Sequence, residues 1–176
     1  VRTSPGFADG FKAIAEGGWL GISADPEYGG MGLPMTLTNA VNDMMVGACL
    51  ALQLNPLMSQ GQIEALEHHA SEEIKALYLP KLISGEWCGT MNLTEPQAGS
   101  DVGALRSKAE PNGDGTYAVS GQKIFISWGD NDFAENVCHL VLARLPDGVP
   151  GPTGISLSLE PKMIPAAERN PGAPDP

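Results

Sequence analysis

The sequence predicts an α+β fold, in which an N-terminal α-helical region is followed by an incomplete antiparallel β-sheet or β-barrel. Two observations support this prediction. Apolar residues recur at helical spacing up to about residue 86. Beyond that point the chain divides into short β-rich runs joined by tight glycine-containing turns, which favour antiparallel pairing. We therefore expect a partial helical domain at residues 1–86, a partial β domain at 87–165 and an irregular tail at 166–176.

The helical region contains four stretches with helix-like patterning. In the first, Phe7, Phe11 and Ile14 recur at helical spacing and Gly17-Gly18 ends the helix. The other three stretches are residues 37–54, 60–70 and 71–84. The 37–54 stretch is apolar nearly all round, so we expect that helix to be buried between other helices. The glycine-rich loop at 25–32 follows no long strand, so we interpret it as a structural turn and not as a phosphate cradle.

The β region contains six short runs that we expect to be strands. They are residues 88–93, 104–110, 116–119, 123–127, 137–143 and 154–159. We expect the strands that would complete a barrel to be missing from this chain, which would leave an open sheet edge.

Composition limits the kinds of partner and compartment that the chain can have. Its net charge of −11 argues against a nucleic-acid partner, and no run is apolar and long enough to predict a membrane span. Cys49, Cys88 and Cys138 lie far apart, so we expect free thiols in a reducing cytoplasm. The chain begins at Val1 with neither an initiator Met nor a signal core, and we expect it to be an internal piece of a longer protein.

The residues alone give only a weak indication of chemistry. The three histidines offer neither a metal-ligand spacing nor a Ser/His/Asp triad. Thr94, Ser100 and Ser127 are hydroxyl residues at turns or strand ends, and Phe125 and Trp128 lie beside Ser127. Such a set suits a planar, hydrogen-bonding ring such as a flavin. An ordinary polar turn beside a core aromatic residue would give the same pattern.

Three motifs in order make the indication more specific. The run MNLTEPQAGSD at residues 91–101 resembles the flavin-binding signature of the acyl-CoA dehydrogenase family. The run GQKIFIS at residues 121–127 resembles that family's Gly-x-Lys-x-Trp-Ile-Thr strand, and residues 18–22 with 26–32 resemble its early helix and loop. The resemblance covers the chain up to about residue 165 and implies FAD as the cofactor.

The resemblance also implies which residues of the first motif bind the cofactor. Met91 and Leu93 would lie against the flavin edge, and Leu93 and Thr94 would offer hydrogen bonds to the pyrimidine side. Gly99 and Ser100 would lie near the pyrophosphate of FAD or near the thioester substrate. Ser100 would also contact coenzyme A.

The resemblance assigns residues of the second motif in the same way. Phe125 would replace the family's tryptophan and pack on the ring system, with Ile126 beside it. Ser127 would replace the usual threonine near N5, the nitrogen that receives hydride. Both replacements keep the chemistry of the original residue, an aromatic face in one case and a hydroxyl in the other.

The reaction implied by the resemblance is the α,β-dehydrogenation of an acyl-CoA thioester to a 2-enoyl-CoA, as part of fatty-acid metabolism. In the family a glutamate from a C-terminal helical domain takes the α proton. We expect no catalytic residue in this chain, since Glu95 reads as a structural hydrogen-bond acceptor and Asp101 as a turn former. The chain alone is then expected to be inactive.

The implied partners are an acyl-CoA substrate and an electron-transfer acceptor, and the full-length protein is expected to be a homo-oligomer. Two alternatives stay open at this point. An acyl-CoA oxidase shares the scaffold but passes electrons to oxygen. A non-catalytic remnant or binding protein would have this chain as its whole product.

Overall fold

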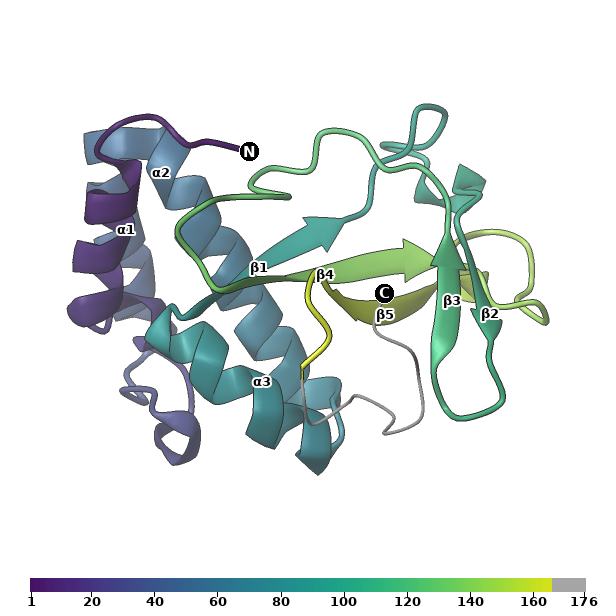
Figure 1. Ribbon diagram of the computed structural model, residues 1–176, viewed down its shortest axis with the longest axis horizontal. Helices are drawn as coiled ribbons and strands as arrows, with labels where there is room; N and C mark the ends of the chain where they lie inside the picture. The colour runs from purple at the N-terminus through teal and green to yellow at the C-terminus, as the bar shows by residue number, and fades with distance from the viewer. Residues whose placement is uncertain (166–176) are drawn as a thin grey trace.

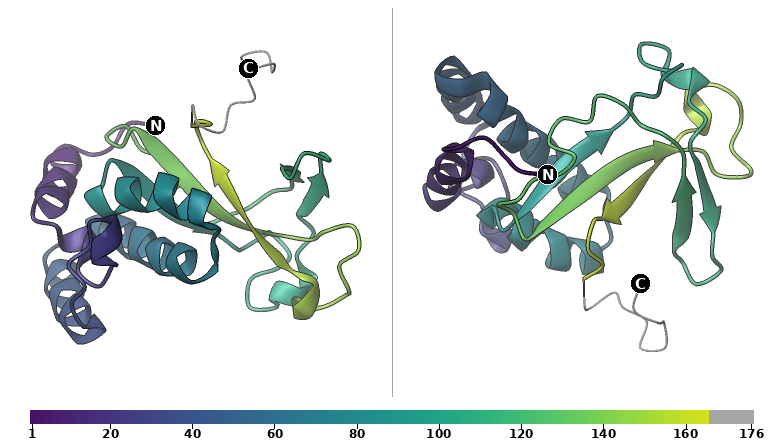
Figure 2. Two further views of the ribbon diagram at one scale, coloured as in Figure 1. Left: turned by 90° about the horizontal axis from the view of Figure 1, so that it is seen from below. Right: turned by 45° about the horizontal axis from the view of Figure 1, so that its top comes forward.

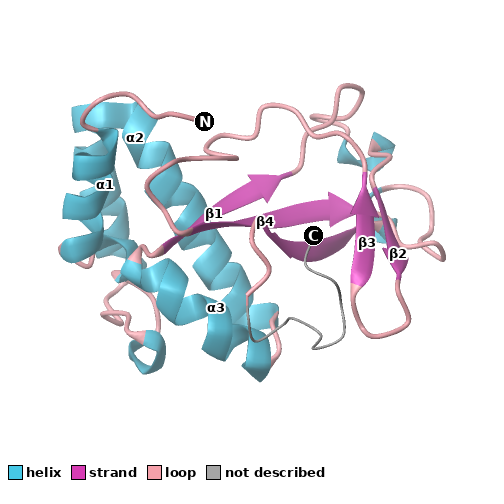
Figure 3. Cartoon of the chain, viewed as in Figure 1, coloured by secondary structure: helices cyan, strands magenta, loops and turns pink. Residues whose placement is uncertain are grey.

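The computed structural model describes residues 1–165, and the tail expected at 166–176 lies outside them. Within residues 1–165, three α-helices come first and five β-strands follow (Figures 1 and 3). The helices are α1 (Phe7–Glu16), α2 (Met35–His69) and α3 (Glu72–Ser84). The strands are β1 (Trp87–Asn92), β2 (Lys108–Pro111), β3 (Tyr117–Ser120), β4 (Asn136–Ala143) and β5 (Ser156–Pro161). The predicted α+β class is confirmed.

The described strands form two small sheets and no closed barrel. The larger sheet has the order β1-β4-β5, and β2 pairs with β3 in a separate antiparallel hairpin. Antiparallel pairing was expected throughout, and it holds for β4 with β5, but β1 and β4 run parallel. A parallel pair requires a long crossover connection, and the chain between Asn92 and Asn136 supplies one that contains the hairpin.

The helices gather at one end of the larger sheet, and the β2–β3 hairpin lies at the other (Figures 1 and 2). The main core joins α2 and α3 to β1, with Leu79 and Leu82 fully buried. There the ring of Tyr78 meets the ring of Trp87 edge-on at 5.4 Å between centroids. The interface between helices and sheet therefore fixes the base of β1, and the turn after β1 starts from a rigid strand.

The two helices expected at 37–54 and 60–70 are joined in α2. The helix is interrupted at Cys49, which has φ −160° and ψ 90°, and it continues through Pro56. The expectation that residues 37–54 would be buried is wrong, because Leu37, Met44 and Leu50 are all exposed. Met44 keeps 70% of its accessible surface. No element within residues 1–165 covers these three side chains.

The glycine-rich loop is a structural turn, as predicted. The Met31 amide donates to Gly21 O and the Leu33 amide to Ile22 O, both at 2.8 Å, so the loop folds back on the chain that enters it. A side chain at Gly30 would put its Cβ 2.0 Å from Ala24 O. The glycine there serves close backbone packing and not a ligand.

Two of the expected strands differ in the structure. Residues 123–127 form no strand, and the 104–110 run is a strand only from Lys108 onward. The reason in the first case is that Phe125 has φ 58°, which is incompatible with an extended strand. No helix in the described part of the chain is both long and apolar enough to cross a membrane.

Candidate functional site

The turn that follows β1 meets the 121–127 segment directly, although about 30 residues separate them in sequence. The Ile124 amide donates to Thr94 O at 2.9 Å. The Lys123 ammonium donates to Leu93 O at 3.1 Å. Two of the three motifs that carry the family resemblance, residues 91–101 and 121–127, are therefore in direct contact.

A buried ion pair holds this junction together. Lys123 Nζ lies 2.9 Å from Glu95 Oε1, and the two side chains expose only 9% and 3% of their surface. Glu95 also accepts the Arg106 amide at 2.7 Å and the Ser107 amide at 3.0 Å. Each carboxylate oxygen is thus hydrogen-bonded inside the protein, as burial of a charge requires.

The same contacts fix the charge state of Glu95. Burial alone would raise the pKa of its carboxyl group, but hydrogen bonds from Ser107, Lys123 and Arg106 outweigh that effect. The pKa is held well below its ordinary value of 4.5. Glu95 is therefore a deprotonated, fully bonded structural acceptor, which confirms the role predicted for it and removes it as a general base.

The turn itself is tightened by a reciprocal pair of backbone bonds. The Glu95 amide donates to Ala98 O at 2.7 Å, and the Ala98 amide donates back to Glu95 O at 3.0 Å. Gly99 and Ser100 follow immediately and are exposed. No hydrogen bond within residues 1–165 joins them to residues 125–127, so the structure unites Thr94 with the second motif but leaves Ser100 apart.

The predicted cofactor-binding side chains lie at or near the surface. Leu93, Thr94 and Ile126 are half-buried, while Met91 and Ser127 are exposed. Phe125 exposes 86% of its surface, far more than a core aromatic residue would. The exposed Phe125 ring offers a flat apolar face on which a planar ligand can pack.

The charge at this junction is compatible with a flavin nucleotide. The one carboxylate that forms the junction, that of Glu95, is turned inward and neutralised by Lys123. The junction thus presents no unpaired carboxylate, which suits a ring with carbonyl oxygens. No cluster able to hold a metal ion occurs among residues 1–165.

Sequence reasoning missed the function of Lys123. It is the single charged residue in the run GQKIFIS, whose neighbours Ile124 and Ile126 are apolar. A lone lysine in an apolar segment needs a buried partner, and a carboxylate in the other motif could have been proposed as that partner.

Comparison with known proteins agrees with the family resemblance of the sequence motifs. The family model described as "Acyl-CoA dehydrogenase, N-terminal domain" matches residues 3–86. The chain is 47% identical over 159 residues to the 3-methylmercaptopropionyl-CoA dehydrogenase of Ruegeria pomeroyi. The match covers 90% of this chain and 27% of that protein. It is 40% identical over 164 residues to a butyryl-CoA dehydrogenase of Syntrophomonas wolfei, covering 93% of this chain and 27% of that protein.

A solved structure shares the fold as well. The acyl-CoA dehydrogenase from Geobacillus kaustophilus superposes with a TM-score of 0.73 at 27% identity, covering 90% of this chain and 40% of that one. The chain therefore spans about a quarter of the length of the two curated relatives.

Proposed function

Since this chain belongs to the acyl-CoA dehydrogenase family, we propose that it supplies one wall of the FAD site in an enzyme that converts an acyl-CoA to a 2-enoyl-CoA. The observation that carries the proposal is the junction between Thr94 and Ile124. It brings two motifs together at a place where the Glu95 carboxylate is paired inside the protein and the Phe125 side chain is exposed.

The residues of this wall have distinct proposed roles. Leu93 and Thr94 hydrogen-bond the pyrimidine side of the flavin, and Met91 packs at its edge. Phe125 covers a ring face with Ile126 beside it. When bound, FAD supplies the acceptor for the hydride that leaves the β carbon of the substrate.

Three further residues, Ser127, Gly99 and Ser100, are proposed to contact polar groups of FAD or of the substrate. Ser127 offers its hydroxyl to the hydride-accepting nitrogen. Gly99 and Ser100, exposed after the turn, contact the pyrophosphate of FAD or the coenzyme A part of the substrate. Since Glu95 is already fully bonded, we propose that the base that takes the α proton is a glutamate in a further helical part of the polypeptide.

The proposal also includes the domain division, the partners and the compartment of the protein. We propose a helical domain at residues 1–86 and a β domain at 87–165. The partners would be an electron-transfer acceptor and further copies of the full-length chain. Cys49, Cys88 and Cys138 form no disulfide, which is in keeping with a reducing compartment such as the cytoplasm.

The test uses the longer polypeptide that contains this chain, purified and mixed with short- and medium-chain acyl-CoAs without oxygen. Bleaching of the visible flavin absorbance, with a 2-enoyl-CoA found by mass spectrometry, is the expected result. Hydrogen peroxide formed in air at the rate of turnover would favour an oxidase instead. A protein that neither contains nor takes up FAD would refute the proposal.

A further inference from the structure

Two aromatic residues in the loop after the Thr94 junction have unusual backbones. Phe125 has φ 58° and Trp128 has φ 57°, and they are the only residues other than glycine with positive φ in the described part of the chain. A side chain on Cβ makes this region unfavourable, so the conformation persists only where contacts on either side enforce it. The loop must therefore be held at both ends.

The end before Phe125 is held by the sheet side of the molecule. Ile124 bonds to Thr94 O, and Lys123 bonds to Leu93 O and Glu95. These contacts fix the chain as it enters the turn.

The end after Ser127 is held by the helical side. The indole Nε1 of Trp128 donates to Ala51 O of α2 at 2.9 Å, across 77 positions of sequence. Ala51 lies two residues beyond the interruption of α2 at Cys49. A carbonyl oxygen has two lone pairs, so Ala51 O can accept the indole N–H in addition to a helical amide.

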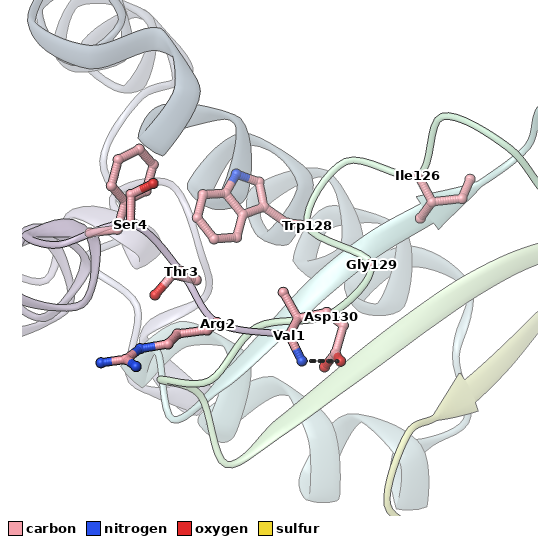
Figure 4. A pocket seen from close by; sticks show the side chains of 9 residues that line it. Val1, Arg2, Thr3, Ser4, Ile126, Trp128, Gly129 and Asp130 are labelled. Atoms are coloured by element: carbon pink, nitrogen blue, oxygen red, sulfur yellow. Dashed lines mark ion pairs between the residues drawn. The ribbon is translucent and has the colours of Figure 1, made fainter.

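The Trp128 ring also contacts two other aromatic rings. Its centroid lies 5.6 Å from that of Phe7 and 5.6 Å from that of Phe133. Figure 4 shows the Trp128 side chain turned toward the helices and Ile126 further along the same loop, at a cavity of about 400 Å³. The ring is thus seated among aromatic side chains, and its N–H makes the directional contact.

Residues 125–127 lie between these two anchors; Phe125 is 86% exposed, Ser127 is exposed and Ile126 is half-buried. We propose that Trp128 is a positioning residue that sets the orientation of Phe125, Ile126 and Ser127 through its hydrogen bond to Ala51. The inference rests on the proposed function in one respect, namely that these three residues contact FAD. The hydrogen bond makes the geometry of the cofactor wall depend on the position of α2.

A purely structural role for Trp128 would need only its ring, whereas the positioning role needs its N–H donor. The variant Trp128→Phe separates these two roles. It keeps an aromatic ring beside Phe7 and Phe133 and removes the N–H donor. The matched control is Trp19→Phe, because the Trp19 indole donates no hydrogen bond within residues 1–165 and is 40% exposed.

The first readout is hydrogen–deuterium exchange in the full-length polypeptide. In Trp128→Phe the amides of residues 125–129 should exchange about two- to ten-fold faster, the range given by loss of one net hydrogen bond. The β2–β3 hairpin should be unchanged, and Trp19→Phe should leave both regions as in the wild type. In the wild type the Trp128 indole N–H should exchange more slowly than the Trp19 indole N–H. This comparison does not depend on the folding of any variant.

The second readout is the bound flavin. Trp128→Phe should change the visible flavin spectrum and weaken FAD binding by about two- to ten-fold, whereas Trp19→Phe should do neither. Exchange and flavin behaviour equal to wild type in Trp128→Phe, or a Trp128 indole that exchanges as fast as that of Trp19, would overturn the positioning role. If the wild type binds no FAD, the proposed function fails, while the exchange measurements still decide whether Trp128 holds the loop.

Discussion

Lys123 and Glu95 form a buried ion pair at 2.9 Å that joins the turn after β1 to the loop carrying Phe125. Every other ion pair of the described residues has at least one partner with 33% exposure or more. Exposed pairs contribute little to stability, whereas removing one partner of a buried pair leaves an uncompensated charge. The Lys123–Glu95 pair is therefore the electrostatic contact on which the candidate site depends most.

Replacing Lys123 by methionine should lower the free energy of unfolding by about 3 to 5 kcal/mol, because the Glu95 carboxylate stays buried without its cation. Urea denaturation followed by circular dichroism measures the change. Lys12→Met is the control, since Lys12 pairs with Glu16 on an exposed helix face and should have little effect. Equal behaviour of the two variants would show that the buried pair does not hold the junction.

The low pKa of Glu95 gives a dependence of stability on pH. The folded-state pKa lies below the ordinary value of 4.5, so the carboxylate contributes its full stability above that pH. The contribution is lost as the pH falls below 4.5 toward the folded-state pKa. Unfolding free energies measured from about pH 6 to pH 3 should fall less steeply in Glu95→Gln than in the wild type. Parallel curves would contradict the assignment.

The sequence predicted the site only in part, and the reason is the range of the interactions. The run at residues 88–93 and the acceptor role of Glu95 were read correctly, because both depend on local pattern. The loop around Phe125 was expected to be a strand, since Ile124 and Ile126 alternate as in a strand. Its actual path is set by contacts to residues about 30 and 77 positions away, which no local pattern contains.

The cysteines should differ sharply in reactivity. Burial raises the pKa of the Cys88 thiol to about 11, so almost none of it is thiolate at neutral pH, and Cys138 is fully buried as well. Cys49 is exposed. Native protein treated with a maleimide at neutral pH should therefore be labelled at Cys49 alone, as peptide mass spectrometry would show, and denatured protein at all three positions. Rapid native labelling of Cys88 would mean that the helix–sheet interface opens.

Two glycines should respond oppositely to alanine. At Gly30 the added Cβ would lie 2.0 Å from Ala24 O, so the loop must shift, and we expect a loss of about 1 to 3 kcal/mol. At Gly47, inside α2, nothing lies within 4 Å of the added atom. Gly47→Ala should stabilise by about 0.4 to 1 kcal/mol, because it restricts the unfolded chain. Thermal unfolding of both variants tests the contrast, and equal midpoints would show that the loop at Gly30 tolerates a side chain.

The 176-residue chain by itself should produce no 2-enoyl-CoA from an acyl-CoA and should retain FAD weakly. A general base must be free to accept a proton, and the carboxylate of Glu95 is fixed by Lys123 and by the amides of Arg106 and Ser107. With Phe125 exposed, this chain supplies only one wall for a ring that would otherwise remain in solvent. Gel filtration with added FAD, followed by absorbance of the protein peak, tests retention, and mass spectrometry of the acyl-CoA pool tests turnover. A yellow protein peak or a steady yield of enoyl-CoA would mean that these residues hold more of the site than one wall, including a base other than Glu95.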